Sequence, residues 1–169
     1  MKSDKYPVVA ITGGIGSGKS YVCRLLEQRG IRVYDCDSAA KRLMRGSTLL
    51  KEQLTRLIGP DTYIDGCLNK AAVAEDFFQS DYTWMETAIL YDCGFDRYAD
   101  IVIAVVAPQE TRISRIIQRD SISREKALEW IAKQMDQQEV ARRADHVVIN
   151  DGTQDLLSQI DRILTKIKE

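Results

Sequence analysis

Short apolar segments alternate with longer stretches in which apolar residues recur every three or four positions. The short segments have the length and continuous hydrophobicity of buried parallel strands, and the longer stretches have helical periodicity. Strands are expected at residues 7–12, 31–34, 83–86, 101–107 and 146–149. This order of elements predicts an α/β fold, with a five-stranded parallel sheet and helices on both faces.

Helices are expected between these strands and after the last one, at residues 19–30, 38–58, 69–79, 109–119, 123–144 and 155–167. The stretch over 38–58 is compatible with a break near Gly46, and Gly59 and Pro60 end it. The final helix has one apolar face formed by Leu156, Leu157, Ile160, Ile163, Leu164 and Ile167. Such a face predicts that the last helix packs on the sheet.

One motif stands between the first strand and the first helix. Residues 13–20 read Gly-Gly-Ile-Gly-Ser-Gly-Lys-Ser, which is G-x-x-x-x-G-K-S in the strand–loop–helix context of a phosphate-binding P-loop. Its glycines let backbone N–H groups point inward, while the Lys can reach the β- and γ-phosphates and the Ser can bind Mg²⁺. A glycine-rich turn without a ligand is the alternative, but the flanking elements favour ATP with Mg²⁺. The residues expected at the nucleotide are Gly14, Ile15, Gly16, Ser17, Gly18, Lys19 and Ser20, with Ser20 as the metal ligand.

Three carboxylates end or follow predicted strands, at the edge where open α/β sheets bind ligands. Asp37 is expected to orient or deprotonate an acceptor hydroxyl, in preference to capping a helix. Asp35 is expected either to support the site or to cap the helix that begins near Ser38. Glu86 either reaches the acceptor or the water shell of the metal, or serves as an acid near a helix N-terminus.

Arginines recur at helical spacing at positions 112, 115 and 119. A solvated basic face is one interpretation, but an arginine-bearing cover that neutralises transition-state charge is favoured for Arg115 and Arg119. Arg143 is a further candidate for the nucleotide phosphates. Asn150 follows the last strand and either contacts the adenine or forms a turn.

Composition excludes several classes of protein. The net charge of −1 lacks the basic footprint of a nucleic-acid binder, and no apolar stretch is long enough to span a membrane. The four cysteines and the single histidine form no metal-ligand pattern, so reduced, buried thiols in a cytoplasmic protein are expected. Trp84 and His146 are interpreted as packing residues. We expect small-molecule partners and a monomer, with an oligomer left open.

The succession of motifs resembles the dephospho-coenzyme A kinase family over nearly the whole chain. Residues 33–41, Val-Tyr-Asp-Cys-Asp-Ser-Ala-Ala-Lys, resemble the family's V-I-D-A-D-x-I-A-R, and residues 86–91, Glu-Thr-Ala-Ile-Leu-Tyr, resemble E-S-A-L-L-Y. Residues 115–120 resemble R-x-x-x-R-D, residues 131–135 resemble I-A-A-Q-M, and residues 144–150 resemble A-D-x-V-I-x-N.

The resemblance implies transfer of the γ-phosphoryl group of ATP to the ribose 3′-hydroxyl of dephospho-coenzyme A. It implies catalytic roles for Asp37, Lys19, Arg115 and Arg119, and substrate binding by Asp35, Lys41 and Glu86. It divides the single domain into a core (6–58, 82–118 and 144–169), an acceptor region (59–81) and a lid (119–143). Another small-molecule or nucleotide kinase of this fold is the alternative, followed by a nucleotide-binding protein without turnover.

The chain departs from the family at three places. Lys41 replaces an Arg, and Trp130 occupies a lid position that often carries Arg. The family's additional helices and His-Pro pair, which shape the acceptor site, are missing between Gln79 and Tyr82. A natural deletion would leave the acceptor pocket half open. We expect instead that a stretch of chain is left out of this numbering, which would show as a break between Ser80 and Tyr82.

Overall fold

A five-stranded parallel sheet forms the centre of the structure, a computed structural model that describes residues 6–46 and 70–168. The strand order is β2-β3-β1-β4-β5, and every pairing is parallel, as the sequence predicted. The strands are β1 (Val9–Thr12), β2 (Val33–Asp35), β3 (Trp84–Glu86), β4 (Ile101–Val106) and β5 (His146–Ile149). Since β1 is central, its carboxyl end meets those of β3 and β4 on either side.

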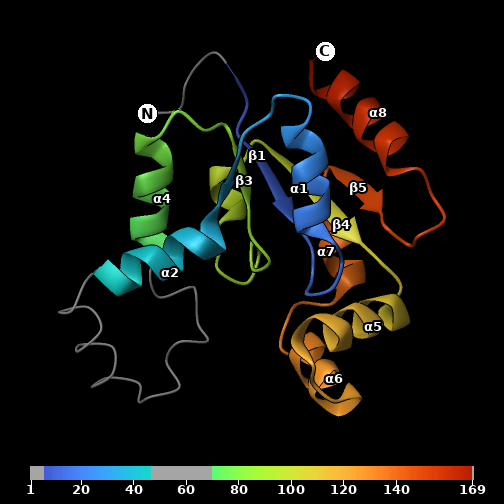
Figure 1. Ribbon diagram of the computed structural model, residues 1–169. Coiled ribbons are helices and arrows are strands. Elements are labelled where there is room, and N and C mark those ends of the chain that lie inside the picture. The colour runs from blue at the N-terminus through green and yellow to red at the C-terminus, as the bar shows by residue number, and fades with distance from the viewer. Residues whose placement is uncertain (1–5, 47–69, 169) are drawn as a thin grey trace.

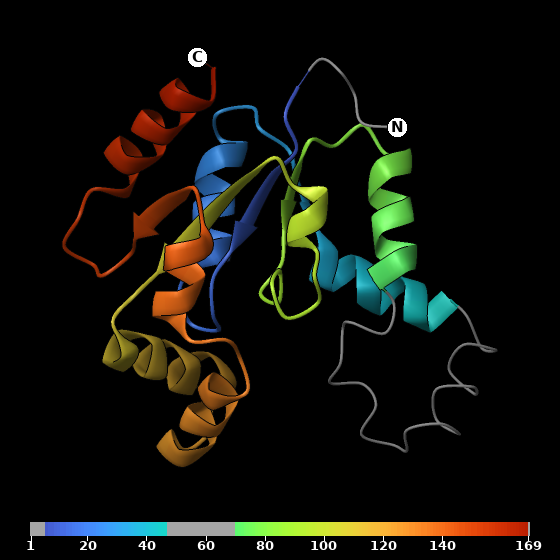
Figure 2. The ribbon, with the colours of Figure 1, turned by 180° about the vertical axis from the view of Figure 1, so that it is seen from behind.

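Helices cover both faces of the sheet, as Figures 1 and 2 show. Helices α1 (Lys19–Glu27) and α8 (Leu156–Lys168) pack on one face, while α2 (Cys36–Gly46) and α4 (Lys70–Gln79) pack on the other. Alternation along β1 explains both layers, because Ile11 packs beside Val22 and Ile160, whereas Ala10 packs beside Phe77. The predicted α/β class with two helical layers is confirmed.

Three helices, α5 (Gln109–Asp120), α6 (Arg124–Ala132) and α7 (Gln137–Arg143), lie between β4 and β5 in the chain. Helices α5 and α6 form a lobe below the sheet in Figure 1, with a small core of Ile113, Ile116 and Ala127. The single helical region expected over 123–144 is divided into α6 and α7. The cause is Asp136, whose side chain accepts hydrogen bonds from the N–H groups of Gln138 (2.8 Å) and Glu139 (3.3 Å) and so begins a new helix.

The chain runs from α4 to β3 without a break. The N–H of Ser80 donates to the carbonyl of Phe77 at 3.1 Å, and the N–H of Tyr82 donates to Ser80 Oγ at 3.3 Å. The expectation that a stretch of chain is left out of the numbering between Ser80 and Tyr82 stays a prediction. Of the predicted acceptor region at 59–81, the part before Lys70 lies outside the described residues, as does the expected helix beyond Gly46.

The cysteines differ from the expectation in one respect. Cys23 and Cys36 are buried free thiols, as predicted. Cys93 is disulfide-bonded, so the prediction of reduced thiols is wrong for this residue. Among the helices of the described residues, none has the length and hydrophobicity needed to cross a membrane.

Candidate active site

The P-loop connects β1 to α1, and its glycines are required by close packing. Gly18 is the N-cap of α1 and has a φ of 93°, in the left-handed region that side chains disfavour. A Cβ atom at Gly18 would lie 2.1 Å from Nδ2 of Asn150, and one at Gly13 would lie 2.2 Å from the carbonyl oxygen of Val105. The loop therefore packs tightly against β4 and the chain after β5. This packing fixes the N-terminus of α1, whose free N–H groups can bind an anion held by the loop.

Arg115 and Asn150 hold the P-loop by its carbonyl oxygens. Nδ2 of Asn150 donates to the carbonyl of Ser17 at 2.9 Å. The Arg115 guanidinium donates to the carbonyls of Gly16 and Ser17, both at 3.3 Å, and to that of Asn150 at 3.2 Å. Because these bonds hold carbonyl groups, they leave the N–H of Gly16 available to phosphate, while the N–H of Ser17 donates to the carbonyl of Gly14 at 3.1 Å. In this structure both residues support the loop, because the N–H groups named here bind carbonyl oxygens of the protein.

Arg112 and Gln134 hold the other end of the loop. Nε of Arg112 donates to the carbonyl of Ile15 at 2.9 Å, and the N–H of Ile15 donates to Oε1 of Gln134 at 2.7 Å. Arg112 is buried, and burial lowers the pKa of its guanidinium while Asp136 opposes that shift. The sequence had not singled out Gln134 for this contact, although it is the Gln of the segment over 131–135.

Lys19 lies where the P-loop meets two of the predicted carboxylates. Its side chain is buried, and burial lowers the pKa of the ammonium group, while the negative charges of Glu86 and Asp37 raise it. The hydrogen bonds agree with this grouping, because Glu86 accepts one from Cys23 on the same helix as Lys19, and Asp37 accepts one from Thr87, the residue after Glu86. The three residues that the sequence proposed from three separate motifs come together at the carboxyl ends of the central strands.

Glu86 has a partner in α1. The thiol of Cys23 donates to Oε2 of Glu86 at 2.8 Å. Burial raises the pKa of the Cys23 thiol, and the charge of Glu86 raises it further, so the thiol keeps its proton and remains a donor. The hydrogen bond fixes one oxygen of the carboxylate.

The two aspartates of the segment over 33–41 have different surroundings. Asp35 accepts hydrogen bonds from the N–H and the hydroxyl of Ser38, at 2.8 and 2.6 Å. It therefore caps α2, which decides between the two alternatives that the sequence left open. Asp37, in the first turn of α2, accepts a hydrogen bond from the hydroxyl of Thr87 at 2.9 Å.

Three predicted site residues are not brought to the P-loop. The exposed guanidinium of Arg119 pairs with Asp120 at 2.6 Å. Arg143 pairs with Glu139 at 2.6 Å and lies over the ring of Tyr91, 5.6 Å from its centroid. Lys41 is exposed on α2. The first two pair with carboxylates near them in sequence, so each would have to change partners to reach a nucleotide.

The oxygen atoms near the P-loop suit Mg²⁺. Ser20 presents an exposed hydroxyl in the first turn of α1, and Asp37 and Glu86 supply carboxylates beside Lys19. Among the described residues, no group of three or more His, Cys, Asp or Glu side chains forms a metal cage. A hydroxyl with nearby carboxylates fits a hard cation that keeps water and phosphate as its other ligands.

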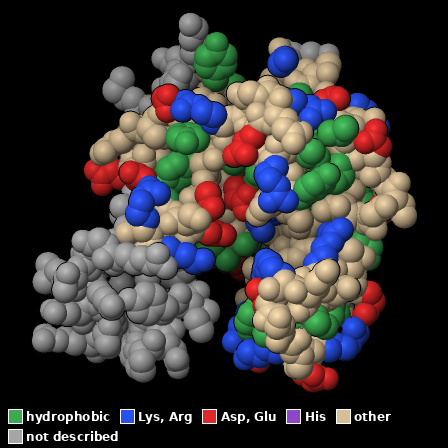
Figure 3. Space-filling model, in the orientation of Figure 1, with side chains coloured by type: hydrophobic (Ala, Val, Ile, Leu, Met, Phe, Trp, Pro, Cys, Tyr) green, Lys and Arg blue, Asp and Glu red, His purple; other side chains and the backbone are tan. Residues whose placement is uncertain are grey.

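Acidic and basic side chains lie in different regions of the surface. On the face seen in Figure 3, acidic side chains gather near the centre, and Lys and Arg side chains surround the lobe of α5 and α6. An anionic nucleotide between them would meet cations from the lobe and carboxylates from the sheet edge.

Comparison with known proteins decides the family. A family model described as dephospho-CoA kinase matches residues 7–84 and 79–155. A dephospho-CoA kinase of Bacteroides fragilis is 34% identical over 181 aligned positions, covering 90% of this chain and 88% of the relative. That of Porphyromonas gingivalis is 36% identical over 189 positions, covering 95% and 94%. The chain belongs to the dephospho-CoA kinase family.

Solved structures agree on the fold. A Thermus thermophilus protein, TT1252, superposes with a TM-score of 0.71 and 28% identity, covering 96% of this chain and 98% of that protein. A shikimate kinase from Acinetobacter baumannii superposes with a TM-score of 0.63 at 20% identity, covering 98% of this chain and 94% of that protein. The latter likeness shows only that the kinase fold is shared.

Members of the dephospho-CoA kinase family carry residues that this chain lacks. The alignment with the Porphyromonas gingivalis relative has 189 positions, which exceeds the 169 residues of the chain. The family model matches in two parts that meet at residues 79–84. This meeting point coincides with the junction of α4 and β3, where the sequence indicated a gap relative to the family.

Proposed function

We propose that this protein transfers the γ-phosphoryl group of ATP to the ribose 3′-hydroxyl of dephospho-CoA, giving CoA and ADP in the last step of coenzyme A biosynthesis. Dephospho-CoA kinase is the family to which the chain belongs. The observation that carries the proposal is that Glu86 accepts a hydrogen bond from Cys23 on the helix that begins at Lys19, while Asp37 accepts one from Thr87, the residue after Glu86. In one site, Lys19 would bind phosphate and Asp37 would accept the proton of the acceptor.

The donor half of the reaction would use the P-loop. Its N–H groups and the N-terminus of α1 would bind the phosphates of ATP, and Lys19 would neutralise the β- and γ-phosphates. Ser20 would hold Mg²⁺ together with water and phosphate oxygens, with Glu86 facing the water shell. When bound, Mg²⁺ supplies charge neutralisation at the transferred group.

The acceptor half would use Asp37. Its carboxylate would orient the 3′-hydroxyl for in-line attack and accept its proton as the new O–P bond forms. Asp35 would act indirectly, because its cap fixes the start of α2 and therefore the place of Asp37.

The arginines divide into two roles in this proposal. Arg115 and Asn150 would keep the P-loop in its phosphate-binding conformation through the carbonyls that they hold. Arg119 and Arg143 would reach the phosphates only when residues 119–143, the proposed lid, close on ATP and each gives up its present carboxylate partner.

The acceptor side is expected to bind its substrate more weakly than in relatives with the full segment. The missing positions adjoin β3, which ends at Glu86, and Lys41 replaces the planar Arg of the family motif. The proposal includes small-molecule substrates only, and a monomer. Kinetics of this protein beside the Bacteroides fragilis relative would show a KM for dephospho-CoA that is about tenfold higher or more, since one lost ionic contact is worth roughly that factor.

A coupled assay tests the function directly. Purified protein is incubated with ATP and Mg²⁺ and either dephospho-CoA, AMP, thymidylate, deoxyadenosine or shikimate, and ADP release is followed. Phosphorus NMR of the product then locates the new phosphate on the ribose. Turnover with dephospho-CoA alone supports the proposal, whereas preference for another acceptor would establish a different kinase of this fold. ATP binding without turnover would indicate a nucleotide-binding protein.

The role of Asp37 is tested by Asp37→Asn. A positioned general base contributes about 10²–10⁴-fold to the rate, so kcat should fall by that factor. The dissociation constant of ATP should change little, since in this proposal Lys19 and the P-loop bind the phosphates and Asp37 serves the acceptor. Near-normal turnover of this variant would show that another group accepts the proton.

A further inference from the structure

Thr87 follows the last residue of β3 and lies at the centre of the site. Its N–H donates to the carbonyl of Ile11 at 3.0 Å, which continues the β1–β3 ladder by one residue beyond Glu86. Since Gly13 opens the P-loop two residues after Ile11, the backbone of Thr87 is fixed beside the loop. The residue is buried, with 3% of its surface exposed.

The hydroxyl of Thr87 has two partners, and together they decide where its proton points. Oγ1 lies 2.9 Å from Oδ1 of Asp37 and accepts a hydrogen bond from the N–H of Ile89 at 3.3 Å. A hydroxyl has a single proton and two lone pairs. Because the N–H of Ile89 is the donor on one side, the hydroxyl is free to donate its single proton to Oδ1 of Asp37 on the other.

The two carboxylate oxygens of Asp37 differ in their hydrogen bonding. Oδ1 is held by Thr87, and among residues 6–46 and 70–168 no other hydrogen-bond donor to Asp37 is found. The second oxygen therefore remains for an incoming hydroxyl. Thr is also stiff at χ1, so the position of its hydroxyl oxygen follows from its backbone, which the hydrogen bond to Ile11 fixes.

We propose that Thr87 is a positioning residue for phosphoryl transfer, which holds the Asp37 carboxylate so that its free oxygen faces the acceptor hydroxyl. The inference rests on the proposed function, in which Asp37 is the base. Thr87 acts through Asp37 and touches neither substrate. Loss of the hydroxyl should lower kcat about tenfold, the factor of one charge-assisted hydrogen bond, with the KM of ATP unchanged.

The test compares Thr87→Val, which keeps the shape and removes the hydroxyl, with Thr87→Ser, which keeps the hydroxyl. Thr87→Val should lose about tenfold in kcat and Thr87→Ser should stay near the wild type. Thermal unfolding and circular dichroism check that each variant folds. If the Ile89 N–H, left without its acceptor, prevents folding of Thr87→Val, Thr87→Ala takes its place, because the void that it leaves can admit water.

A double-mutant cycle separates positioning from a general loss of structure. In the Asp37→Asn background Thr87→Val should cost no further activity, because the group that it positions is already gone. Normal turnover of Thr87→Val, an equal loss in Thr87→Ser, or the same tenfold loss in the Asp37→Asn background would each overturn the inference. Full activity of Asp37→Asn would instead refute the proposed base, so the two failures are distinguishable.

Discussion

The side chain of Gln134 accepts a hydrogen bond from the backbone N–H of Ile15 at 2.7 Å. One residue lies in the turn between α6 and α7, and the other lies in the P-loop. Arg112 holds the carbonyl of the same residue, so Ile15 is bound from the lobe on both sides of its backbone. The region proposed as the lid is thereby attached to the loop that would bind phosphate.

Gln134→Ala should weaken ATP binding. The substitution leaves the Ile15 N–H without this partner and frees the turn between α6 and α7, so the dissociation constant of ATP should rise by about three- to tenfold, in line with a net hydrogen bond of roughly 1 kcal/mol. Calorimetric titration with ATP measures it. Gln138→Ala, an exposed glutamine on α7, is the matched control and should bind ATP normally. Equal binding by both variants would show that the contact is not used.

Arg115 and Arg119 should fail in different ways. Arg115→Lys keeps the charge but loses the planar fork that spans Gly16, Ser17 and Asn150, so both ATP affinity and the temperature of unfolding should fall. Arg119→Met should leave both close to the wild type and lower kcat about tenfold or more, if the exposed guanidinium reaches the phosphates on closure. Steady-state kinetics with thermal unfolding would distinguish them. Loss of affinity in Arg119→Met with normal kcat would contradict the closure model.

ATP binding should take up protons at alkaline pH. Burial lowers the pKa of Lys19 below its ordinary 10.5, and the nucleotide phosphates will raise it again. Two pKa values matter for stability: the lowered pKa of Lys19 in the folded, ligand-free protein and its ordinary pKa in the unfolded chain. Between them the unfolded chain binds a proton that the folded protein has lost, so the free energy of unfolding contributed by Lys19 rises with pH in this window. Calorimetry of ATP binding in buffers of different ionisation enthalpy measures the uptake. Lys19→Met should show weak binding and no uptake from this group, and equal uptake by both proteins would refute the assignment.

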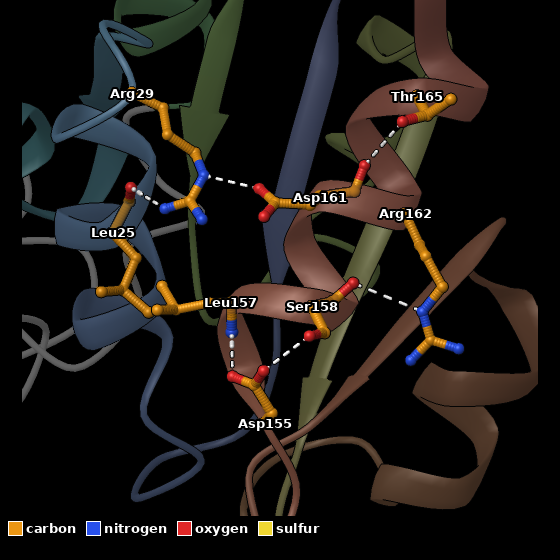
Figure 4. A network of polar contacts seen from close by, with 8 residues as sticks. All are labelled: Leu25, Arg29, Asp155, Leu157, Ser158, Asp161, Arg162 and Thr165. Carbon is orange, nitrogen blue, oxygen red and sulfur yellow. Dashed lines mark hydrogen bonds and ion pairs between the residues drawn. The ribbon is translucent and has the colours of Figure 1, made fainter.

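The N-terminal cap of α8 at Asp155 should contribute more to stability than the ion pair between Asp161 of α8 and Arg29. Figure 4 shows Asp155 accepting hydrogen bonds from the N–H of Leu157 (3.0 Å) and the hydroxyl of Ser158 (2.5 Å), and Arg29 pairing with Asp161 at 2.7 Å. Asp155→Ala removes the cap and should lower the urea midpoint. Arg29→Ala should change it little, because the Asp161 side chain is exposed.

The same cap gives a pH dependence of known sign. The hydrogen bonds from Ser158 and Leu157 lower the pKa of Asp155 below its ordinary 3.8. The stabilisation is therefore complete above the unfolded pKa and is lost as the pH falls through the lower, folded value. Asp155→Asn keeps a capping oxygen without titrating, so its urea midpoint should lose less on acidification than that of the wild type. An identical acid dependence would assign the loss to other carboxylates.

Local sequence patterns were sufficient to predict the α/β fold, the P-loop and the carboxylates near it. Continuous apolar runs identified β1 and β4, because a strand buried on both faces has few polar positions, whereas β5 at the edge of the sheet exposes Val147 and Ile149. The P-loop was recognisable because glycine, lysine and serine at fixed spacing answer a local requirement of backbone conformation. Glu86 ends β3 and Asp37 follows β2, and the parallel pairing of these two strands brings their carboxyl ends together.

The sequence by itself thus determined the sheet, the phosphate loop and the carboxylates beside it. Only the tertiary structure decided that Asp35 is a cap, that Arg115 and Asn150 hold loop carbonyls, and that Thr87 and Gln134 contact Asp37 and Ile15. The physical reason is that periodicity reports which face of an element is buried. It carries no information on which distant donor meets which acceptor, because that depends on how separately formed elements pack.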